Sequence, residues 1–503
     1  MSDAASTDHH APNVRSTITQ WLIAIALGAL AGLALANIAP LAPQPAGMAR
    51  YAMPLWLCVP FVTLLLSIAC GPLALPKLWH KFDAAWAFFL GSIVGAYYLF
   101  ALTDAHYGSY HVLHVGAEYL SFIALVGGLY VASAGIVIHY GSVQRWGDAP
   151  QSEDAPHAGI RGTGPIANCI LLLAGAILAN LVGTTGASVL LIRPFIRANA
   201  QRLTPLHVVF FILIVSNCGG CLTPIGDPPL YLGFIKGVPF FWVLEHLWQS
   251  WIIVVGALLA VFYAYDSHVE RRLRISMGDA YVPPAPFAAM RIRAKPISLI
   301  LGALITASVF IDPLLRSRFP DFHFPVGPIV QLALAALSFL VANKDYIRAN
   351  EFSFAPVREV ATLFAGIFLT MMPALAFLAQ HGKNLGLDTP IKYYFATGIL
   401  SAVLDNAPTY LNFLQVAVAP DEVTKDSVRA LLGTHVGNAD VIAISSGAVF
   451  FGALTYIGNG PNFMVRAIAQ ARGVKMPGFF PYAAYATLIL GPILILHGLL
   501  IIL

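Results

Sequence analysis

The stretch Thr223-Pro-Ile-Gly-Asp-Pro-Pro229 interrupts an apolar segment of the chain, and Thr455-Tyr-Ile-Gly-Asn-Gly-Pro461 interrupts another one 232 residues later. The two stretches share Thr, Ile, Gly and Pro in register. Proline and glycine break a helix when they occur in its interior, so each stretch predicts a helix that unwinds in its middle. We expect two broken helices, over residues 203–235 and 436–472, in equivalent positions of an internal repeat.

The chain around these stretches has too few charges to be soluble. Of its 503 residues, 58% are hydrophobic and only 10% are Asp, Glu, Lys or Arg, whereas a soluble globular protein carries about 25% charged residues. The composition therefore predicts an all-α polytopic membrane protein whose main partner is the lipid bilayer. It excludes a disordered chain, a coiled coil and a nucleic-acid-binding surface.

The apolar stretches predict about 11 transmembrane helices, because a spanning helix needs about 20 mostly apolar residues. They lie near residues 19–41, 52–70, 83–102, 117–139, 203–235, 240–266, 296–315, 325–343, 358–378, 436–472 and 479–503. Two further apolar segments, 165–198 and 391–419, are interrupted in their middle by polar residues, at Asn180–Gly186 and Leu404–Thr409. We expect these two segments to be re-entrant hairpins.

Positive charge sets the expected orientation in the membrane. The loop between residues 266 and 296 contains six Lys and Arg residues, so we expect it to be cytoplasmic. Threading outward from it places the N-terminus in the cytoplasm and the C-terminus outside, in the inner (cell) membrane of a bacterium. The two hairpins then enter from opposite sides, which makes the repeats inverted. The expected parts are a tail (1–18), an extra first helix (19–41), repeat one (52–266), a basic linker (267–295) and repeat two (296–503).

Breaks at membrane depth indicate a transport site, because unpaired backbone groups are not tolerated in hydrocarbon unless they are buried in protein or line a wet cavity. Inverted repeats with discontinuous helices are typical of secondary transporters. The candidate ion- or substrate-binding residues are Asn180, Thr184, Thr185, Asn217, Thr223, Gly226, Asp227, Asp405, Asn406, Thr409, Thr455, Gly458, Asn459 and Asn462. Most carry hard oxygen ligands of the kind that alkali cations prefer.

Two of these residues are acids at membrane depth, which makes each of them a functional candidate. We expect a sodium ion at Asp405, Asn406, Thr184 and Thr185, with Asp405 as the carboxylate at which cation and proton compete. The alternative for both Asp405 and Asp227 is that the side chain caps a half-helix. No cofactor is expected, and sodium ion and proton are the expected transported or coupling ions.

Other polar residues give weaker signals. His435, Asp440, Glu245 and His246 lie near the ends of predicted spans, where a place at the membrane interface accounts for them as well as a proton path does. Cys218-Gly-Gly-Cys221 resembles a thiol motif for a soft metal or arsenite, but cysteine beside two glycines more often serves as a small packing residue.

The motifs quoted above resemble a known family. Ser216-Asn-Cys-Gly-Gly-Cys-Leu-Thr-Pro-Ile-Gly-Asp-Pro-Pro229 is similar to the Asn-x-Gly-Gly-x-x-Thr-Pro-Ile-Gly-Asp signature of NhaD-type sodium/proton antiporters, and Leu404-Asp-Asn-Ala-Pro408 resembles their second-hairpin motif. The wider group is the ion transporter superfamily, which includes citrate and dicarboxylate carriers and arsenite pumps. The resemblance implies an elevator-like movement of the hairpin domain, often in a homodimer. Cys218, Cys221 and Pro228-Pro229 depart from the antiporter pattern.

Charge distinguishes the two transport labels that this resemblance carries. No Lys or Arg lies at the hairpin tips or in the breaks, which favours a sodium (or lithium)/proton antiporter over a carrier of anions. A sodium- or proton-coupled citrate or dicarboxylate transporter is the alternative, because helix N-termini can hold carboxylates without basic side chains. An intramembrane aspartyl protease is a distant alternative that needs two paired acids. The counterpart of Asp227 is the neutral Asn459, so we expect no enzyme.

Overall fold

Helices make up almost all of the regular structure. The computed structural model describes residues 14–41, 51–102, 105–142, 163–278, 281, 288–319 and 324–502. Within these ranges, 11 helices are long and apolar enough to cross a membrane, in agreement with the predicted all-α polytopic membrane protein. The set differs from the prediction in one exchange. The segment predicted as a hairpin forms the long α5 (Pro165–Ala198), whereas the predicted span 325–343 is the 16-residue α11 (Val326–Val341).

The described residues form two compact units. Unit 1 contains the residues up to Tyr119 and Arg358–Phe377, and unit 2 contains the rest. The elements of unit 1 are α1 (Val14–Ile38), a 3-10 turn (Leu55–Cys58), α2 (Val59–Ala74), α3 (Pro76–Phe100), the start of α4 (Ala105–Ser133) and most of α13 (Ala355–His381). The helix α4 begins at Ala105, where the sequence predicted a loop up to about residue 116.

Small residues let two helices of unit 1 approach closely. Gly28 and Gly32 lie one turn apart on α1, and a Cβ atom at either position would overlap a backbone carbonyl oxygen of α3, at Phe89 and Ile93 respectively. This spacing of glycines is typical of tightly packed membrane helices. The predicted extra first helix therefore packs along α3.

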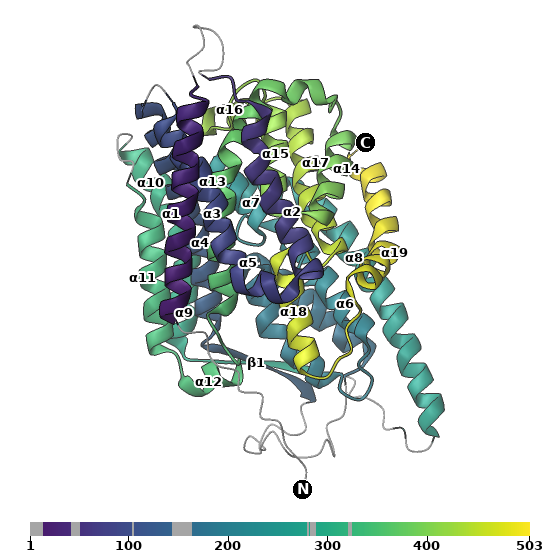
Figure 1. Cartoon of the computed structure of the whole chain (residues 1–503). Helices are drawn as coiled ribbons and strands as arrows, with labels where there is room; N and C mark the ends of the chain where they lie inside the picture. Colours follow the sequence, from purple (N-terminus) through teal and green to yellow (C-terminus); the bar gives the residue numbers. More distant parts are fainter. Residues whose placement is uncertain are drawn as a thin grey trace. The chain divides into compact units, whose positions relative to one another are not determined.

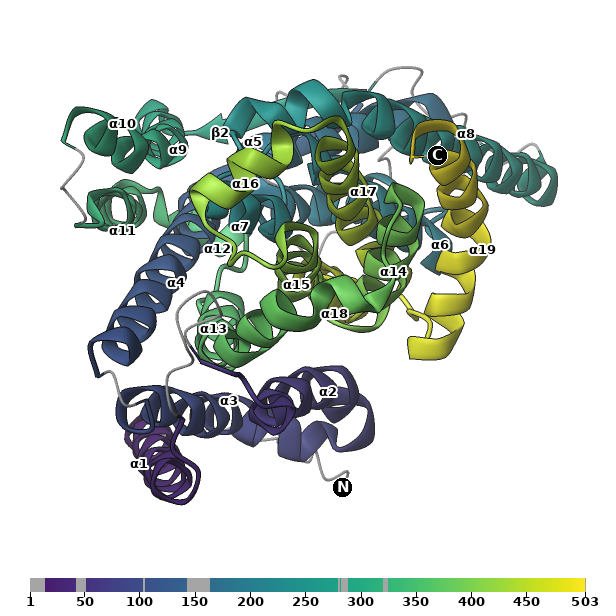
Figure 2. The same ribbon diagram turned by 90° about the horizontal axis from the view of Figure 1, so that it is seen from above.

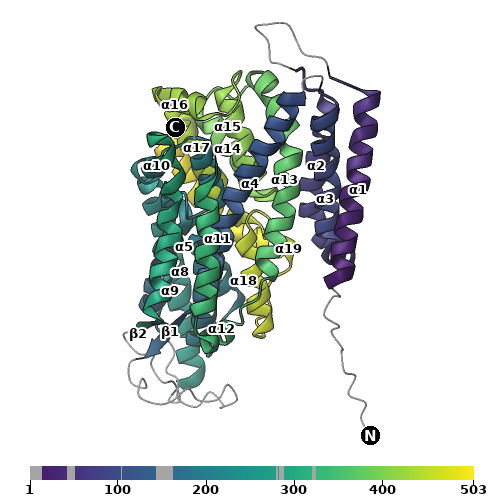
Figure 3. The ribbon, with the colours of Figure 1, turned by 90° about the vertical axis from the view of Figure 1, so that its left-hand side faces the viewer.

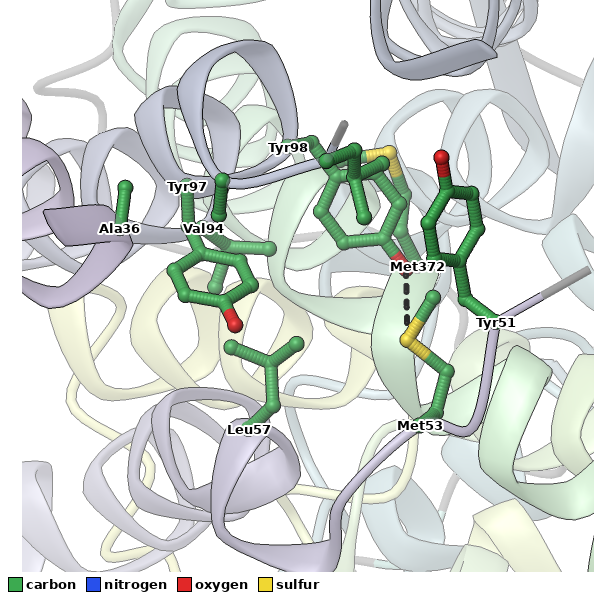
Figure 4. Close-up of a cluster of buried hydrophobic side chains, with 10 residues drawn as sticks. Ala36, Tyr51, Met53, Leu57, Val94, Tyr97, Tyr98 and Met372 are labelled. Atoms are coloured by element: carbon green, nitrogen blue, oxygen red, sulfur yellow. Dashed lines mark hydrogen bonds between the residues drawn. The ribbon is translucent and has the colours of Figure 1, made fainter. Parts of the chain in front are cut away.

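A group of buried side chains fills one end of unit 1 (Figure 4). The hydroxyl of Tyr98 donates a hydrogen bond to the sulfur of Met53 (3.8 Å), and the hydroxyl of Tyr97 donates to the carbonyl of Ala39 (2.6 Å). Met372 of α13 joins the same cluster. Both tyrosine hydroxyls thus have acceptors although their rings are buried, as expected for polar groups in an apolar core.

Unit 2 carries both of the predicted breaks (Figure 1). Its elements are β1 (Ile136–Ser142), α5, α6 (Pro205–Ile214), α7 (Pro228–Lys236), α8 (Phe240–Met277), β2 (Ala288–Ala294), α9 (Pro296–Ala307), α10 (Ile311–Arg318), α11, α12 (Lys344–Ala349), α14 (Pro390–Val403), α15 (Asn406–Val418), α16 (Lys425–Leu432), α17 (His435–Phe451), α18 (Gly460–Ala471) and α19 (Phe479–His497).

A short antiparallel ladder joins β1 to β2, in a register that runs from Ile136 opposite Ala294 to Ser142 opposite Ala288. The sequence predicted a span up to residue 139 and a solvated linker over 267–295. Instead, α4 ends at Ser133, α8 continues to Met277, and the last part of the linker forms β2. The β-branched run Ile136-Val137-Ile138 favours a strand over a further helical turn.

Two other segments of unit 2 fold back on themselves. The helix α5 contains a non-helical residue, Gly183 (φ +79°), in its middle. Its two ends meet, since the amide of Thr163 donates to the carbonyl of Ala198 (3.2 Å) and Asn168 donates to Asn199 (2.7 Å). A straight helix of 34 residues would separate its ends by about 50 Å. The chain between α14 and α15 reverses in the same way, at Leu404 and Asp405.

The connections of unit 2 gather on two opposite faces (Figure 3). The β1–β2 ladder and α12 lie on one face, at the bottom of the view, and α10 and α16 lie on the other, at the top. On the ladder face, Asn350 donates hydrogen bonds to the carbonyl groups of Ala134 (3.0 Å) and Ile136 (2.7 Å). The helix α5 also packs against β1 of this ladder.

Candidate functional site

The two breaks have the same construction. After α6 the chain passes through a 3-10 turn (Cys218–Leu222) and an extended Thr223 (φ −140°, ψ 154°) before α7 begins. After α17 it passes through a 3-10 turn (Gly452–Leu454) and an extended Thr455 (φ −133°, ψ 167°) before α18 begins. The positions of the breaks agree with the sequence, because Pro and Gly act locally on the backbone.

Each break is bonded to the neighbouring chain reversal in the same pattern. The hydroxyl of Thr223 donates to the carbonyl of Asn180 (2.7 Å), and the hydroxyl of Thr455 donates to the carbonyl of Ala402 (2.6 Å). The two carbonyl groups lie near the ends of the first arms of the reversals, in α5 before Gly183 and in the last turn of α14, where a helix leaves carbonyl groups without a helical partner. We call each break together with its neighbouring chain reversal a half-site. Thr223 and Thr455 hold the two parts of their half-sites together.

Backbone bonds complete the match. The amide of Thr184 donates to the carbonyl of Gly226 (2.8 Å), and the amide of Asn406 donates to the carbonyl of Gly458 (3.2 Å). Neither glycine has a positive φ. A Cβ atom on Gly226 would overlap the carbonyl oxygen of Gly220, and one on Gly458 would come within 2.5 Å of the carbonyl oxygen of Gly452. Close backbone approach, rather than an unusual backbone angle, is what requires glycine at both places.

The carboxylate of Asp227 lies where the two half-sites meet. One of its oxygens accepts hydrogen bonds from the hydroxyl of Thr184 (3.1 Å) and the amide of Asn459 (2.9 Å), and the other accepts from the amide of Asn406 (2.8 Å). Asp227 is 1% exposed. Three predicted site residues from α5, α15 and the second break thus converge on one buried acid.

In the part of the chain that the structure describes, no positive side chain is paired with Asp227. Each of its three hydrogen-bond donors is neutral. Neutral donors stabilise a carboxylate but leave its net charge unbalanced. An ionised Asp227 therefore calls for a bound cation.

Asp405 has a different environment. Its carboxylate accepts a hydrogen bond from the amide of Ala407 (3.0 Å) and so caps α15, which is the alternative that the sequence left open. The hydroxyl of Thr409 donates a hydrogen bond to the backbone carbonyl of Asp405 (2.8 Å). The expected sodium set of Asp405, Asn406, Thr184 and Thr185 is brought together only in part, because Asn406 and Thr184 point their side chains to Asp227 instead.

A cavity of about 20 Å³ lies beside this junction. It is lined by the reversal of α5 from Val182 to Gly186, by Pro224–Pro228 of the first break, and by Leu125, Val126, Leu129 and Tyr231. Thr185 of the expected sodium set belongs to this lining. About 10–15 Å³ suffices for one water molecule, so this small cavity has room for a water or a single small ion next to Asp227.

Three amides hold the breaks in place. Asn180 accepts from the amide of Leu222 (2.7 Å) and donates to the carbonyl of Gly219 (2.7 Å). Asn217 donates to Asn462 (2.7 Å), which in turn donates to the carbonyl of Thr455 (2.9 Å). The predicted residues Asn180, Asn217 and Asn462 are thus occupied with the backbone of the breaks and with one another.

A buried ionic cluster at the ends of α5 was missed from the sequence. Asp266 of α8 is fully buried and accepts hydrogen bonds from Arg202 (3.0 Å), His207 (3.0 Å) and Asn168 (2.7 Å). Arg202 also donates to the carbonyl of Thr163. No spacing in the sequence links α8 to the ends of α5, so only the three-dimensional structure reveals that Asp266 fastens them together.

A second ionic contact lies on the same face. Glu351 (φ +46°) follows α12 and binds both Arg193 of α5 (3.1 Å) and Arg472 beyond α18 (2.6 Å). Partial burial raises the pKa of Glu351, but the charges and hydrogen bonds of the two arginines outweigh it, so its pKa lies below its usual value. Glu351 therefore joins an arm of the first half-site to an arm of the second.

None of the weaker candidates from the sequence is among the described hydrogen-bond partners of Asp227. The ring of His246 contacts the carbonyl of Trp242 (2.9 Å), and one oxygen of the buried Asp440 has no partner among the described residues. Cys218 and Cys221 are fully buried. The described part of the chain contains no group of three or more His, Cys, Asp or Glu residues that could hold a metal ion.

With this geometry established, comparison with known proteins places the chain. Residues 50–502, nearly the whole chain, match a family described as putative citrate transport. The chain belongs to this family. No curated protein matches it. Membership of the citrate transport family and the 11 apolar helices together identify an integral membrane transporter.

Proposed function

We propose that this member of the citrate transport family is a cation-coupled secondary transporter that exchanges sodium or lithium ions for protons at Asp227. The observation that carries the proposal is the environment of this carboxylate, which is buried and faces a cavity of about 20 Å³. Among the described residues it receives side-chain hydrogen bonds from the neutral Thr184, Asn406 and Asn459. The proposal moves the competition between cation and proton from Asp405 to Asp227.

The electrostatics of burial explain why exchange would follow. An isolated charge away from water is strongly disfavoured, so Asp227 is stable only with a proton or with a cation beside it. The two cannot be bound at once, because protonation removes the charge that attracts the cation. Mutually exclusive occupancy of one carrier site is sufficient for antiport. Asp405, one residue before Asn406, supplies a second acid to the same region.

The proposal includes the membrane arrangement expected from the sequence. In it, the fold-back of α5 and the α14–α15 reversal are re-entrant hairpins, in two inverted repeats. The paired hydrogen bonds of Thr223 with Asn180 and of Thr455 with Ala402 support this arrangement. The ladder face is then cytoplasmic, together with the N-terminus, and the C-terminus is external. A homodimer remains a prediction from the family resemblance.

Coupled transport of a di- or tricarboxylate is the second candidate. The helices α7, α15 and α18 all begin at the junction, with Asp227, Asp405 and Asn459 as their first flanking residues. The N-terminus of a helix attracts anions through its free amide groups and its dipole. A carboxylate could bind there beside a cation held by Asp227, in keeping with the description of the family.

A flux measurement separates the two candidates. Purified protein in proteoliposomes is exposed to an inward sodium gradient while the internal pH is recorded, and uptake of labelled citrate is followed in parallel. Antiport predicts a sodium-driven pH change that is absent in Asp227→Asn, with no citrate uptake. Citrate uptake that depends on sodium, without a pH change in the absence of citrate, would replace antiport by the second candidate.

A further inference from the structure

A second and larger cavity lies on the α10–α16 face of unit 2. Its volume is about 230 Å³, and it is lined by the end of α7, by α10 and the turn before it, by the start of α11 and by α16. These elements lie close together in the view from above (Figure 2). We call it the large cavity, in contrast to the small cavity beside Asp227.

Polar groups on the wall of the large cavity suit it to water and hydrated ions. Gln331 of α11 is only 2% exposed, and its side-chain oxygen has no hydrogen-bond partner among the described residues. A buried amide without a partner is costly unless water or a ligand supplies one. Asp312 lies on the same wall and accepts a hydrogen bond from the amide of Gly327 (2.9 Å). Lys425 and Arg429 line the cavity from the exposed surface of α16.

One residue belongs to both cavities. Of the described side chains that line either cavity, only Tyr231 lines both. It lies one turn after Asp227 on α7 and is 5% exposed. Its ring packs against Phe122 and Phe234, and its hydroxyl donates to the carbonyl of Ser121 on α4 (3.1 Å). The tyrosine is thus held in place between the two cavities by contacts of its ring and by the hydrogen bond of its hydroxyl.

We infer that the large cavity is the access route to Asp227 from the α10–α16 face and that the ring of Tyr231 is the barrier in this route. The inference rests on the proposed function, since it assigns a path to the same ion site. Asp227 immediately precedes α7 and Tyr231 lies in the first turns of this helix, so a movement of α7 that carries the ion site also moves the barrier. Opening then requires the hydroxyl of Tyr231 to leave the carbonyl of Ser121.

Cysteine accessibility tests the route without depending on transport. Val126→Cys reports on the small cavity and Ser308→Cys on the large one, because each residue lines only one of the two. A membrane-impermeant cationic methanethiosulfonate is added from the side on which a cysteine at the exposed Asp426 of α16 reacts. Modification is read for each peptide by mass spectrometry, which separates the introduced cysteines from the five native ones.

The ring of Tyr231 should control only the inner reporter. We expect Ser308→Cys to react readily in every background, and Val126→Cys to react about tenfold faster when combined with Tyr231→Ala, equivalent to about 1.4 kcal/mol. Val309→Ala is the matched control, because Val309 lines the large cavity alone. It should leave the rate at Val126→Cys unchanged. Tyr231→Phe keeps the ring and loses only the bond to Ser121, so its effect should be smaller than that of Tyr231→Ala.

Three results would overturn the inference: fast modification of Val126→Cys with Tyr231 intact, no acceleration by Tyr231→Ala, or modification only from the opposite face. Reaction of Ser308→Cys from one side of the membrane only, at an unchanged rate, shows that each variant is inserted and folded, because an unfolded chain would expose this buried position and raise the rate. If the labelling confirms the route but sodium drives no proton flux, antiport is rejected and the access route stands. If the labelling rejects the route but the flux is intact, the access route is rejected and antiport stands.

Discussion

The two half-sites share a backbone and differ in charge. The hydroxyls of Thr223 and Thr455 make equivalent hydrogen bonds to backbone carbonyl groups of the neighbouring reversals. Gly226 and Gly458 each lie against the carbonyl oxygen of the glycine six residues earlier. Yet the residue that precedes α7 is Asp227, whereas the residue that precedes α18 is Asn459, and the amide of Asn459 donates to the carboxylate of Asp227. The shared Thr and Gly positions build the backbone frame, and the pair Asp227 and Asn459, one of three positions at which the two stretches differ, gives the difference in charge. If so, frame variants should have equal effects in the two halves, and charge variants should not.

Removing the negative charge of Asp227 should have the largest effect on transport. Asp227→Asn removes the only carboxylate at the junction that accepts from both halves, and we expect sodium-driven proton flux to fall by about a hundredfold or more. The double variant Asp227→Asn with Asn459→Asp places the charge at the matching position before α18. We expect it to recover part of the flux in proteoliposomes. A wild-type rate in Asp227→Asn would remove this carboxylate from the mechanism.

Adding a methyl group at Gly226 or at Gly458 should lower the stability of the protein by similar amounts. Gly226→Ala and Gly458→Ala each drive a Cβ atom against a backbone carbonyl, and overpacking of this kind destabilises by about 1–3 kcal/mol. Thermal unfolding in detergent should show a lowered midpoint for both. Gly460→Ala is the control, since a Cβ atom there meets nothing within 4 Å. A tolerant Gly458 beside a sensitive Gly226 would mean that the halves are not built alike.

Removing one hydroxyl from each half sharpens the comparison. Thr223→Val and Thr455→Val keep the shape and leave the carbonyl groups of Asn180 and Ala402 without their donors. Loss of a buried hydrogen bond with one partner left unpaired costs about 1–3 kcal/mol. We expect equal losses in the two variants by chemical or thermal unfolding, and near wild-type stability in Thr223→Ser and Thr455→Ser, which keep the hydroxyl.

Asp405→Asn should have a smaller effect than Asp227→Asn. Asparagine caps a helix about as well as aspartate, so α15 keeps its first hydrogen bond to Ala407 and stability should change little. The flux at low sodium should decline because a neighbouring negative charge is lost, while exchange continues at high sodium. If Asp405→Asn abolishes exchange at every sodium concentration and Asp227→Asn does not, Asp405 is the exchanging group.

The smallest effect should come from Glu351, which joins the two halves at the ladder face. Because its folded pKa is lowered, its contribution to stability is present above its unfolded pKa and is lost as the pH falls through the folded value. The unfolded value is about 4.3. Thermal unfolding of the wild type from pH 7 to pH 3 should therefore lose a component that is absent in Glu351→Gln. Identical pH profiles would show that the contact with Arg193 and Arg472 adds nothing.

The frame of the site could be read from the sequence because its signals are local. Proline and glycine at Thr223–Pro229 and Thr455–Pro461 place the breaks, and the polar run Asn180–Gly186 places the reversal of α5. The choice between Asp227 and Asp405 could not be made in this way. Both acids precede a half-helix, and only the distances to Thr184, Asn406 and Asn459 separate the acid at the junction from the one that caps.

The partners of residues far apart in the sequence could not be predicted either, because the sequence signals are local. Asp266 and Arg202 lie near the ends of apolar segments, where a place at the membrane interface accounts for a charge equally well. The pairing of β1 with β2 joins residues about 150 positions apart in the sequence, and no periodicity in either strand encodes the other. Contacts of this kind depend on how helices assemble, not on how each one forms.

The β1–β2 ladder has a mechanical consequence. The chain leaves α4 through β1, forms α5 to α8, and returns through β2 into α9, so the ladder pairs the segment that leads into this group of helices with the segment that leads out of it. The pairing keeps the end of α4 and the start of α9 linked to each other if α5 to α8 move. A disulfide across the ladder, between cysteines at Ile136 and Ala294, should then leave transport intact, because the two paired strands do not need to move relative to each other.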